Sequence, residues 1–255
     1  MNKFFIIAEK NKQSMNEKYL ETFIPLDYKD GISFNHDIRY WHSLYFGMFL
    51  LDYFKLPKKV CVDVGTHKGL YASVYARHFS EVHAFEPSPP LHTVANLNFI
   101  RQNIPNITLH KTALLDESIE CKFYTHYLDD KKTDISGSNS ALINYSSNPQ
   151  IKKTDVSTII SKTLDSYNLD IDFIKIDAEG NEYKVLKGAE GTILKSKPAI
   201  QVELAGVSDL EPLIHDYLIS LGYEKVNLKE FSYIHPLLTN IDNEFYLQKE
   251  TLNGS

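Results

Sequence analysis

Two acidic residues flank a glycine-containing loop in the first third of the chain. The segment 63–69 reads Asp-Val-Gly-Thr-His-Lys-Gly, and Glu86 follows Gly69 after seventeen residues. Each acid closes a short β-branched run, which places both carboxylates at predicted strand ends beside a turn that opens a helix. This arrangement is typical of a nucleotide site in which Glu86 accepts hydrogen bonds from both hydroxyls of a ribose.

The loop favours a cationic nucleotide over a diphosphate. His67 stands where the dinucleotide fingerprint has a second close-approach glycine, and the carboxylate of Asp63 would face a pyrophosphate at close range. S-adenosylmethionine has an ammonium and a sulfonium group and no phosphate, so we expect it to be the cofactor. The predicted cofactor-binding residues are Asp63, Gly65, Thr66, His67, Gly69, Glu86 and Asp177. A flavin, a nicotinamide dinucleotide or a turn that binds nothing are the alternatives.

A second acidic cluster follows the β-branched run 172–176. Lys175, Asp177 and Glu179 alternate along the chain, so their side chains point the same way while the backbone stays extended. A hydroxyl that attacks a sulfonium methyl needs alignment first and then a group that accepts its proton. We predict Asp177 as the base or orienting group, followed by Glu179, with Lys175 in the same catalytic set. Glu203 ends the next strand and is the predicted substrate-binding residue.

These acids allow two other interpretations. Asp177, Glu179 and Glu203 could ligate a divalent metal that binds a pair of hydroxyls, although we do not favour a metal. An acid at a strand end can also cap the helix that follows it, here from Asn181. Away from the loop, the histidines at positions 110, 126, 215 and 235 show no spacing typical of metal ligands.

Elements that would position these residues follow Lys58. Short β-branched runs alternate there with helical stretches, which predicts a mostly parallel sheet with helices on both faces. The expected strands are 60–64, 82–85, 107–114, 172–176, 199–204, 223–228 and 245–248, and the expected helices are 69–79, 89–102, 182–194 and 210–221. Because the carboxyl ends of parallel strands share one edge of a sheet, we expect both acidic groups to lie at that edge.

The domain organisation predicted is an N-terminal helical extension, residues 1–55, followed by one main domain, residues 56–255. Residues 116–150 are polar and lack helical periodicity, so they are interpreted as an insertion with a hairpin and a loop. Aromatic residues at helical spacing over 37–54 predict a helix that packs on the sheet or on another subunit, or that acts as a lid over an acceptor pocket.

Composition argues against several classes of protein. Of 255 residues, 27 are Lys or Arg and 33 are Asp or Glu, and the net charge of −6 disfavours a protein that mainly binds nucleic acid. Two cysteines, Cys61 and Cys121, suit a reducing compartment. No apolar run approaches the ~20 residues of a membrane helix, and no signal peptide is visible. We expect a cytoplasmic protein.

The motifs resemble those of the FkbM-type S-adenosylmethionine-dependent methyltransferases. The matching residues are Val62-Asp63-Val64-Gly65 with Gly69, Ala84-Phe85-Glu86-Pro87, Lys175-Ile176-Asp177-Ala178-Glu179-Gly180 with Glu182, Val185-Leu186-Lys187-Gly188-Ala189, and Pro198 through Glu203-Leu204. The resemblance implies a Rossmann-like class I methyltransferase fold with a seven-stranded sheet. It also implies methyl transfer, usually to a hydroxyl on a sugar or a natural product.

Carried over residue by residue, Asp63, Gly65 and Glu86 are similar to the cofactor contacts of that family, and Asp177 and Glu179 fall on its acidic motif after the fourth strand. The family also has a Thr-Leu-Asp segment before that strand. Two segments of this chain could correspond to it, Thr163-Leu164-Asp165 and Thr154-Asp155.

The function predicted is S-adenosylmethionine-dependent O-methylation of a hydroxyl on a sugar, a glycan or another small molecule. One alternative is an RNA ribose methyltransferase with Lys175, Asp177 and Glu203 in its cleft, and another is a catalytically silent cofactor-binding scaffold. The expected partner is a small-molecule or glycan acceptor, and nucleic acid is disfavoured. The aromatic N-terminal segment could also join copies of the chain into a homo-oligomer.

Overall fold

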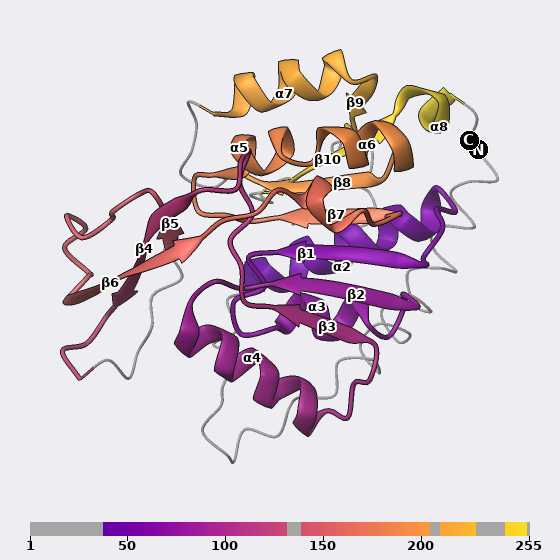
Figure 1. Cartoon of the computed structure of the whole chain (residues 1–255). Coiled ribbons are helices and arrows are strands. Elements are labelled where there is room, and N and C mark those ends of the chain that lie inside the picture. Colours follow the sequence, from indigo (N-terminus) through magenta and orange to yellow (C-terminus); the bar gives the residue numbers. More distant parts are fainter. Residues whose placement is uncertain (1–37, 132–138, 205–209, 228–242, 254–255) are drawn as a thin grey trace. The chain divides into compact units, whose positions relative to one another are not determined.

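The computed structural model describes residues 38–131, 139–204, 210–227 and 243–253 (Figure 1). The chain divides into two compact units, Met1–Leu50 with Asn227–Ile241 and Leu51–Val226 with Asp242–Ser255. Helix α2 (Ile38–Tyr53) agrees with the helix predicted over 37–54, whereas the rest of the predicted extension lies outside the described residues. None of the described helices combines the length and apolar character needed to cross a membrane.

The larger unit contains a seven-stranded sheet in the order β3-β2-β1-β7-β8-β10-β9. Its strands are β1 (Val60–Val64), β2 (Glu81–Phe85), β3 (Ile107–His110), β7 (Phe173–Ile176), β8 (Ala199–Glu203), β9 (Tyr223–Lys225) and β10 (Asn243–Gln248). Strand β10 is antiparallel to both of its neighbours, and the other described pairs in this sheet are parallel. The strand order reverses between β1 and β7, so the carboxyl ends of these two strands form the switch point at which such sheets bind ligands.

Helices cover both faces of this sheet, as Figure 1 shows. On one face lie α3 (Leu70–Tyr75) and α4 (Pro89–Arg101), and on the other lie α5 (Glu182–Lys187), α6 (Glu190–Ser196) and α7 (Glu211–Ser220). The short helix α8 (Lys249–Asn253) follows β10. The α/β fold with a mostly parallel seven-stranded sheet and helices on both faces is therefore confirmed.

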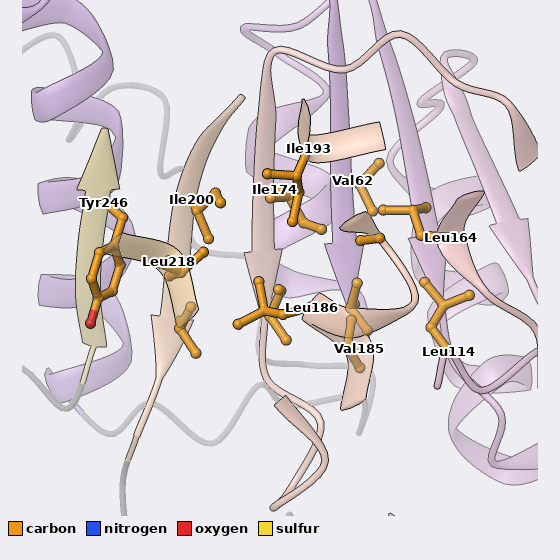
Figure 2. Close-up of a cluster of buried hydrophobic side chains, with 14 of the residues drawn as sticks. Val62, Leu114, Leu164, Ile174, Val185, Leu186, Ile193, Ile200, Leu218 and Tyr246 are labelled. Carbon is orange, nitrogen blue, oxygen red and sulfur yellow. The ribbon is translucent and has the colours of Figure 1, made fainter. Parts of the chain in front are cut away.

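The two faces of the central strands differ in chemistry. Val62, Ile174 and Ile200 are in register on β1, β7 and β8 and are fully buried in the apolar cluster under α5–α7 (Figure 2). Because side chains alternate along a strand, the next residues, Asp63, Lys175 and Gln201, point to the opposite face. They are buried as well, so the sheet contains a row of polar side chains that must satisfy one another.

One predicted helix, 182–194, is two helices in the structure. An added Cβ at Gly188 would stand 2.0 Å from the carbonyl oxygen of Leu115, so the backbone approaches a neighbouring segment closely there. The backbone N–H of Asp165 donates to the carbonyl of Gly188 at 3.0 Å. These contacts interrupt the helix at Gly188, and α6 starts again from Glu190.

Two strands of the predicted insertion, β4 and β5, form a three-stranded antiparallel sheet with β6, in the order β5-β4-β6, which we call the small sheet. Its strands are β4 (Glu120–Tyr127), β5 (Ser140–Ala141) and β6 (Lys153–Ile160). Strand β6 lies beyond the segment 116–150 and was not predicted, because its mostly polar residues alternate between half-buried and exposed positions rather than forming an apolar run. The strand predicted over 107–114 ends at His110, and Leu114 makes only an isolated bridge with Lys162.

The two Thr-Asp segments both have structural contacts. In Thr163-Leu164-Asp165, the Asp165 carboxylate accepts the backbone N–H groups of Gly191 at 2.9 Å and Thr192 at 2.7 Å, and also the Thr192 hydroxyl at 2.7 Å. It therefore caps the N-terminus of α6. In the other segment, Asp155 on β6 accepts the Tyr127 hydroxyl at 3.3 Å.

Replacing the α6 cap should lower the stability of the fold. We expect Asp165→Ala to reduce the free energy of unfolding by about 2 kcal/mol, because three donors at the helix terminus lose their acceptor. Chemical denaturation measures the change. The control is Asp170→Ala, which removes one exposed hydrogen bond to Ser196 at the other end of α6 and should cost under about 0.5 kcal/mol. Equal losses in the two variants would contradict the capping role.

Candidate functional site

The loop after β1 is tied to the ends of its two neighbouring strands. The backbone N–H groups of Gly65 and Thr66 both donate to the carbonyl of Phe85 at 3.0 Å. Gly65 has φ of 76°, and an added Cβ would stand 1.8 Å from the carbonyl oxygen of Asp177. At Gly69, φ is 84° and a Cβ would meet the Phe99 ring at 2.5 Å. Protein atoms therefore fill the space that the two glycines leave. The loop lies directly against Asp177, the first residue of the segment 177–180, which we call the acidic segment.

Asp63 is fully buried beneath this loop. The hydroxyl of Thr66 donates to its Oδ2 at 2.6 Å. Burial raises the pKa of Asp63 above its usual range, while the ammonium of Lys175 and the Thr66 hydroxyl oppose that rise. The carboxylate is thus poorly solvated and would gain from an additional positive partner.

Glu86 holds the loop from the end of β2. It is 4% exposed, and its two carboxylate oxygens accept the backbone N–H groups of His67 and Ser88, each at 2.9 Å. Burial raises the pKa of Glu86 to about 8, although these two donors oppose the rise. Each carboxylate oxygen has a further lone pair, so Glu86 can still accept hydroxyl donors such as those of a ribose.

Some buried polar atoms in and beside the loop lack a hydrogen-bond partner. Within the described part of the chain, Asp63 Oδ1, His67 Nε2 and Ser88 Oγ are buried and make no hydrogen bond. Burial, reinforced by Lys68, lowers the pKa of His67 to about 4, so its ring is neutral. Two carboxylates together with neutral polar atoms match the ammonium and ribose hydroxyls of S-adenosylmethionine, so the residues present fit this cofactor.

Lys175 occupies the centre of the second cluster. Its side chain is 2% exposed, and its Nζ donates to Asp177 Oδ2 at 2.9 Å and lies 4.5 Å from the centre of the Tyr71 ring. Burial alone would lower the pKa of Lys175, but the carboxylates of Asp177 and Asp63 raise it well above its usual value. The ammonium group therefore stays charged.

The three acids around Lys175 differ in protonation. Burial opposes ionisation of Asp177, but Lys175 and a hydrogen bond from Glu203 bring its pKa below the usual value. Burial and the neighbouring charge of Asp177 raise the pKa of Glu203 and of Glu179 to about 9. At neutral pH the cluster consequently holds one ammonium–carboxylate pair and two neutral carboxylic acids. Asp177 pairs with Lys175, and among the described residues no hydrogen bond joins its carboxylate to the first turn of α5, so the capping interpretation has no support.

The acidic segment turns sharply after β7. Glu179 and Gly180 have φ of 50° and 90°, both left-handed. The buried carboxylate of Glu182 accepts the backbone N–H groups of Ala178 at 2.9 Å and Gly180 at 3.1 Å. Glu182 therefore holds the turn that presents Asp177 and Glu179.

Sequence reasoning did not identify two further residues that contact this segment. The Tyr145 hydroxyl donates to the carbonyl of Glu179 at 3.0 Å, and the Asn181 amide donates to the carbonyl of Ala141 at 2.8 Å. These contacts join residues 34 and 40 positions apart, and no local motif or spacing signals them. The only sequence signal for the role of Glu182 in this turn was its position in the family motif.

The structure brings the predicted site residues to one edge of the sheet. Asp63, Lys175 and Glu203 lie on the adjacent strands β1, β7 and β8, Glu86 directly follows β2, and Asp177 directly follows β7. Over residues 38–131, 139–204, 210–227 and 243–253, no group of three or more His, Cys, Asp and Glu side chains is placed to hold a metal ion. The individual roles of these residues remain predictions.

Comparisons with known proteins give a family. The family model described as the methyltransferase FkbM domain matches residues 63–225. No curated protein sequence matches the chain at a significant level.

Solved structures with a related fold include methyltransferase FkbM from Methylobacillus flagellatus KT, which is 17% identical with a TM-score of 0.51. That match covers 74% of this chain and 43% of the other, so the chain spans less than half of that protein. An rRNA methylase from Streptococcus thermophilus is 14% identical, with coverages of 84% and 96% and a TM-score of 0.43. Human methyltransferase 10 domain containing protein is 13% identical, with coverages of 93% and 96% and a TM-score of 0.45.

The family model covers well over half of the chain and includes both the loop at Asp63 and the acidic segment at Asp177. Its match agrees with the resemblance found in the motifs, and the first of the related structures supports the same fold. This chain therefore belongs to the FkbM methyltransferase family.

Proposed function

We propose that this protein is an S-adenosylmethionine-dependent O-methyltransferase that acts on a hydroxyl of a sugar, a glycan or another small molecule. The observation that supports this most is the close approach of the loop 63–69 to the backbone of Asp177. Gly65, in the loop beside Asp63 and Glu86, packs against the carbonyl of Asp177. If Asp63 and Glu86 hold the cofactor, the acceptor molecule would bind next to it, beside Asp177 and Glu179.

The residues that would hold the cofactor follow from their chemistry. Glu86 suits the ribose hydroxyls, and the buried carboxylate of Asp63 suits the ammonium group. When bound, S-adenosylmethionine supplies a methyl group on a sulfonium that a hydroxyl oxygen can attack, and a thioether is left behind.

The chain must then orient the acceptor hydroxyl and take its proton. Asp177 is ionised, and its side chain is 21% exposed, so it can accept a hydrogen bond from the hydroxyl and align the oxygen. Lys175 keeps that carboxylate charged. The low pKa of Asp177 makes it a weak base, whereas Glu179, once ionised, is the stronger one. We therefore assign orientation to Asp177 and proton acceptance to Glu179.

The charges of the acids around Lys175 also favour an uncharged hydroxyl compound as the acceptor. A phosphate or carboxylate next to the reacting oxygen would face the ionised Asp177, and like charges repel strongly in a partly buried site. A hydroxyl on an uncharged ring or chain meets no such penalty. Neutral carboxylic acids, as Glu179 and Glu203 are at neutral pH, can both donate and accept hydrogen bonds with such a polyol.

Cofactor binding should depend on Glu86. We expect calorimetry to show binding of S-adenosylhomocysteine to the unaltered protein, and Glu86→Ala to weaken it about 10- to 100-fold, because the hydrogen bonds from the ribose hydroxyls are lost and the His67 and Ser88 N–H groups lose their acceptor. Glu81→Ala is the matched control, since Glu81 lies half-exposed at the opposite end of the same strand. A folded protein that binds no S-adenosylhomocysteine, or a Glu86→Ala variant that binds it normally, would refute the cofactor assignment.

Cofactor binding should also release protons. The raised pKa values of Glu86, Glu179 and Glu203 mean that these groups hold protons in the free protein. A bound cation favours their ionised forms and lowers those pKa values, so protons leave on binding. S-adenosylmethionine, with its sulfonium charge, should release more protons than S-adenosylhomocysteine.

Calorimetry near neutral pH, in buffers of different ionisation enthalpy, counts the released protons. The difference between the two ligands should shrink in Glu179→Gln. Equal proton release for both ligands would show that the sulfonium does not approach this cluster.

Methyl transfer should require Asp177 and Glu179. Transfer of radiolabelled methyl to a panel of monosaccharides and polyols should fall about 100-fold in Asp177→Asn and in Glu179→Gln. The rate should rise with pH towards about 9, because Glu179 accepts a proton only when ionised, and Glu179→Gln should abolish that rise. Asp116→Asn, which alters a surface ion pair with Lys184, is the control. Undiminished transfer in both variants would disprove the assignment.

A further inference from the structure

The small sheet and the loop that follows β5, which carries Tyr145, support the acidic segment from outside the main sheet. Two hydrogen bonds connect them. The Tyr145 hydroxyl donates to the backbone carbonyl of Glu179 at 3.0 Å, and the Asn181 side-chain amide donates to the carbonyl of Ala141 on β5 at 2.8 Å. The Asn181 amide also donates to the carbonyl of Ala178 at 3.1 Å, so it links β5 to both ends of the turn.

Glu179 needs such support because of its backbone conformation. Its φ of 50° is left-handed, a region in which a side chain crowds the following carbonyl and which residues other than glycine rarely adopt. This conformation directs the Glu179 carboxyl towards Asp177, Glu182 and Lys175, whose charges all act on it. If the Glu179 carbonyl lost its donor, the turn could relax and the carboxyl would move away from Asp177.

Tyr145 is itself fixed by a buried histidine. The Tyr145 backbone N–H donates to His126 Nε2 at 3.2 Å, and the two rings meet edge to face at 6.2 Å. His126 is fully buried, and burial lowers its pKa, so the ring is neutral. Because Nε2 accepts a hydrogen bond, the proton resides on Nδ1, which donates to the Thr154 hydroxyl on β6 at 2.8 Å. The histidine thereby connects Tyr145 to both long strands of the small sheet.

We propose that Tyr145 is a positioning residue for methyl transfer. His126 holds Tyr145 in place, and the Tyr145 hydroxyl keeps the Glu179 backbone in its left-handed conformation. That conformation sets the Glu179 carboxyl beside Asp177. The small sheet thus acts on the reaction through the geometry of Glu179. The consequence for catalysis rests on the proposed function, but the effect on Glu179 does not.

The test is a carboxyl titration of Glu179 in Tyr145→Phe. Carbon-13 NMR of protein labelled at the glutamate side-chain carboxyls follows each titration, and Glu179→Gln assigns the signal. We expect the pKa of Glu179, about 9 in the unaltered protein, to fall by at least about one unit, because the carboxyl moves away from a like charge. The signals of Glu86 should not change.

Tyr127→Phe is the matched control. This residue lies on β4 in the same small sheet, and the variant loses a hydroxyl hydrogen bond to Asp155 on β6. Its Glu179 titration should be the same as that of the unaltered protein. Asn181→Ala, which removes the second connection, should shift Glu179 in the same direction as Tyr145→Phe. An unchanged Glu179 titration in Tyr145→Phe, or an equal shift in Tyr127→Phe, would overturn the proposal.

Calorimetry with S-adenosylhomocysteine on the same variants separates this inference from the proposed function. Tyr145→Phe should bind with unchanged affinity, because Asp63 and Glu86 are intact, and should lose about tenfold in turnover with any acceptor found. If the unaltered protein fails to bind S-adenosylhomocysteine, the proposed function is wrong whatever Glu179 does. If binding is normal and the Glu179 titration does not shift, the inference alone is wrong.

Discussion

The buried ammonium of Lys175 is the interaction on which the arrangement of this protein depends. It lies in register with Asp63 on the neighbouring strand and pairs with Asp177 at 2.9 Å. Without it, acids from three adjacent strands would face one another in a nearly water-free space, and each would carry a large desolvation cost. With it, Asp177 stays charged while Glu179 and Glu203 keep their protons. The same ammonium therefore stabilises the polar face of the sheet and leaves one acid of the cluster ionised and two neutral.

The sheet places this chemistry by simple alternation. Val62, Ile174 and Ile200 enter the apolar core under α5–α7, and the residues next to them turn to the other face. Beyond the last strand residues the backbone must reverse, and Gly65 lies so close to Asp177 that the two loops share one surface. Glu86 and Glu182 then fix these loops by accepting backbone N–H groups. The site is thus rigid because carboxylates satisfy the amides of the loops that carry it.

Features that depend on strand order and local pattern were predictable from the sequence. Each acid ends a recognisable β-branched run, so its place at one edge of a parallel sheet follows, and the family resemblance is confirmed. Features that depend on contacts between distant segments were not predictable. Strand β6 is stabilised by pairing with β4 rather than by an apolar run, and the interruption at Gly188 depends on the backbone of Leu115 and on Asp165. Tyr145 contacts Glu179, and His126 contacts Tyr145, only because the chain folds these distant segments together. No spacing in the sequence indicates either contact.

We propose that a cationic, phosphate-free nucleotide binds between the loop 63–69 with Glu86 and the acidic segment at Asp177 and Glu179. A crystal structure of the protein grown with S-adenosylhomocysteine tests this proposal most directly. We expect ribose hydroxyls within hydrogen-bond distance of Glu86, the amino group close to Asp63, and the sulfur facing Asp177 and Glu179. A ligand bound elsewhere, or one bound at this edge of the sheet with its ribose away from Glu86 or its sulfur away from the acidic segment, would contradict the proposal.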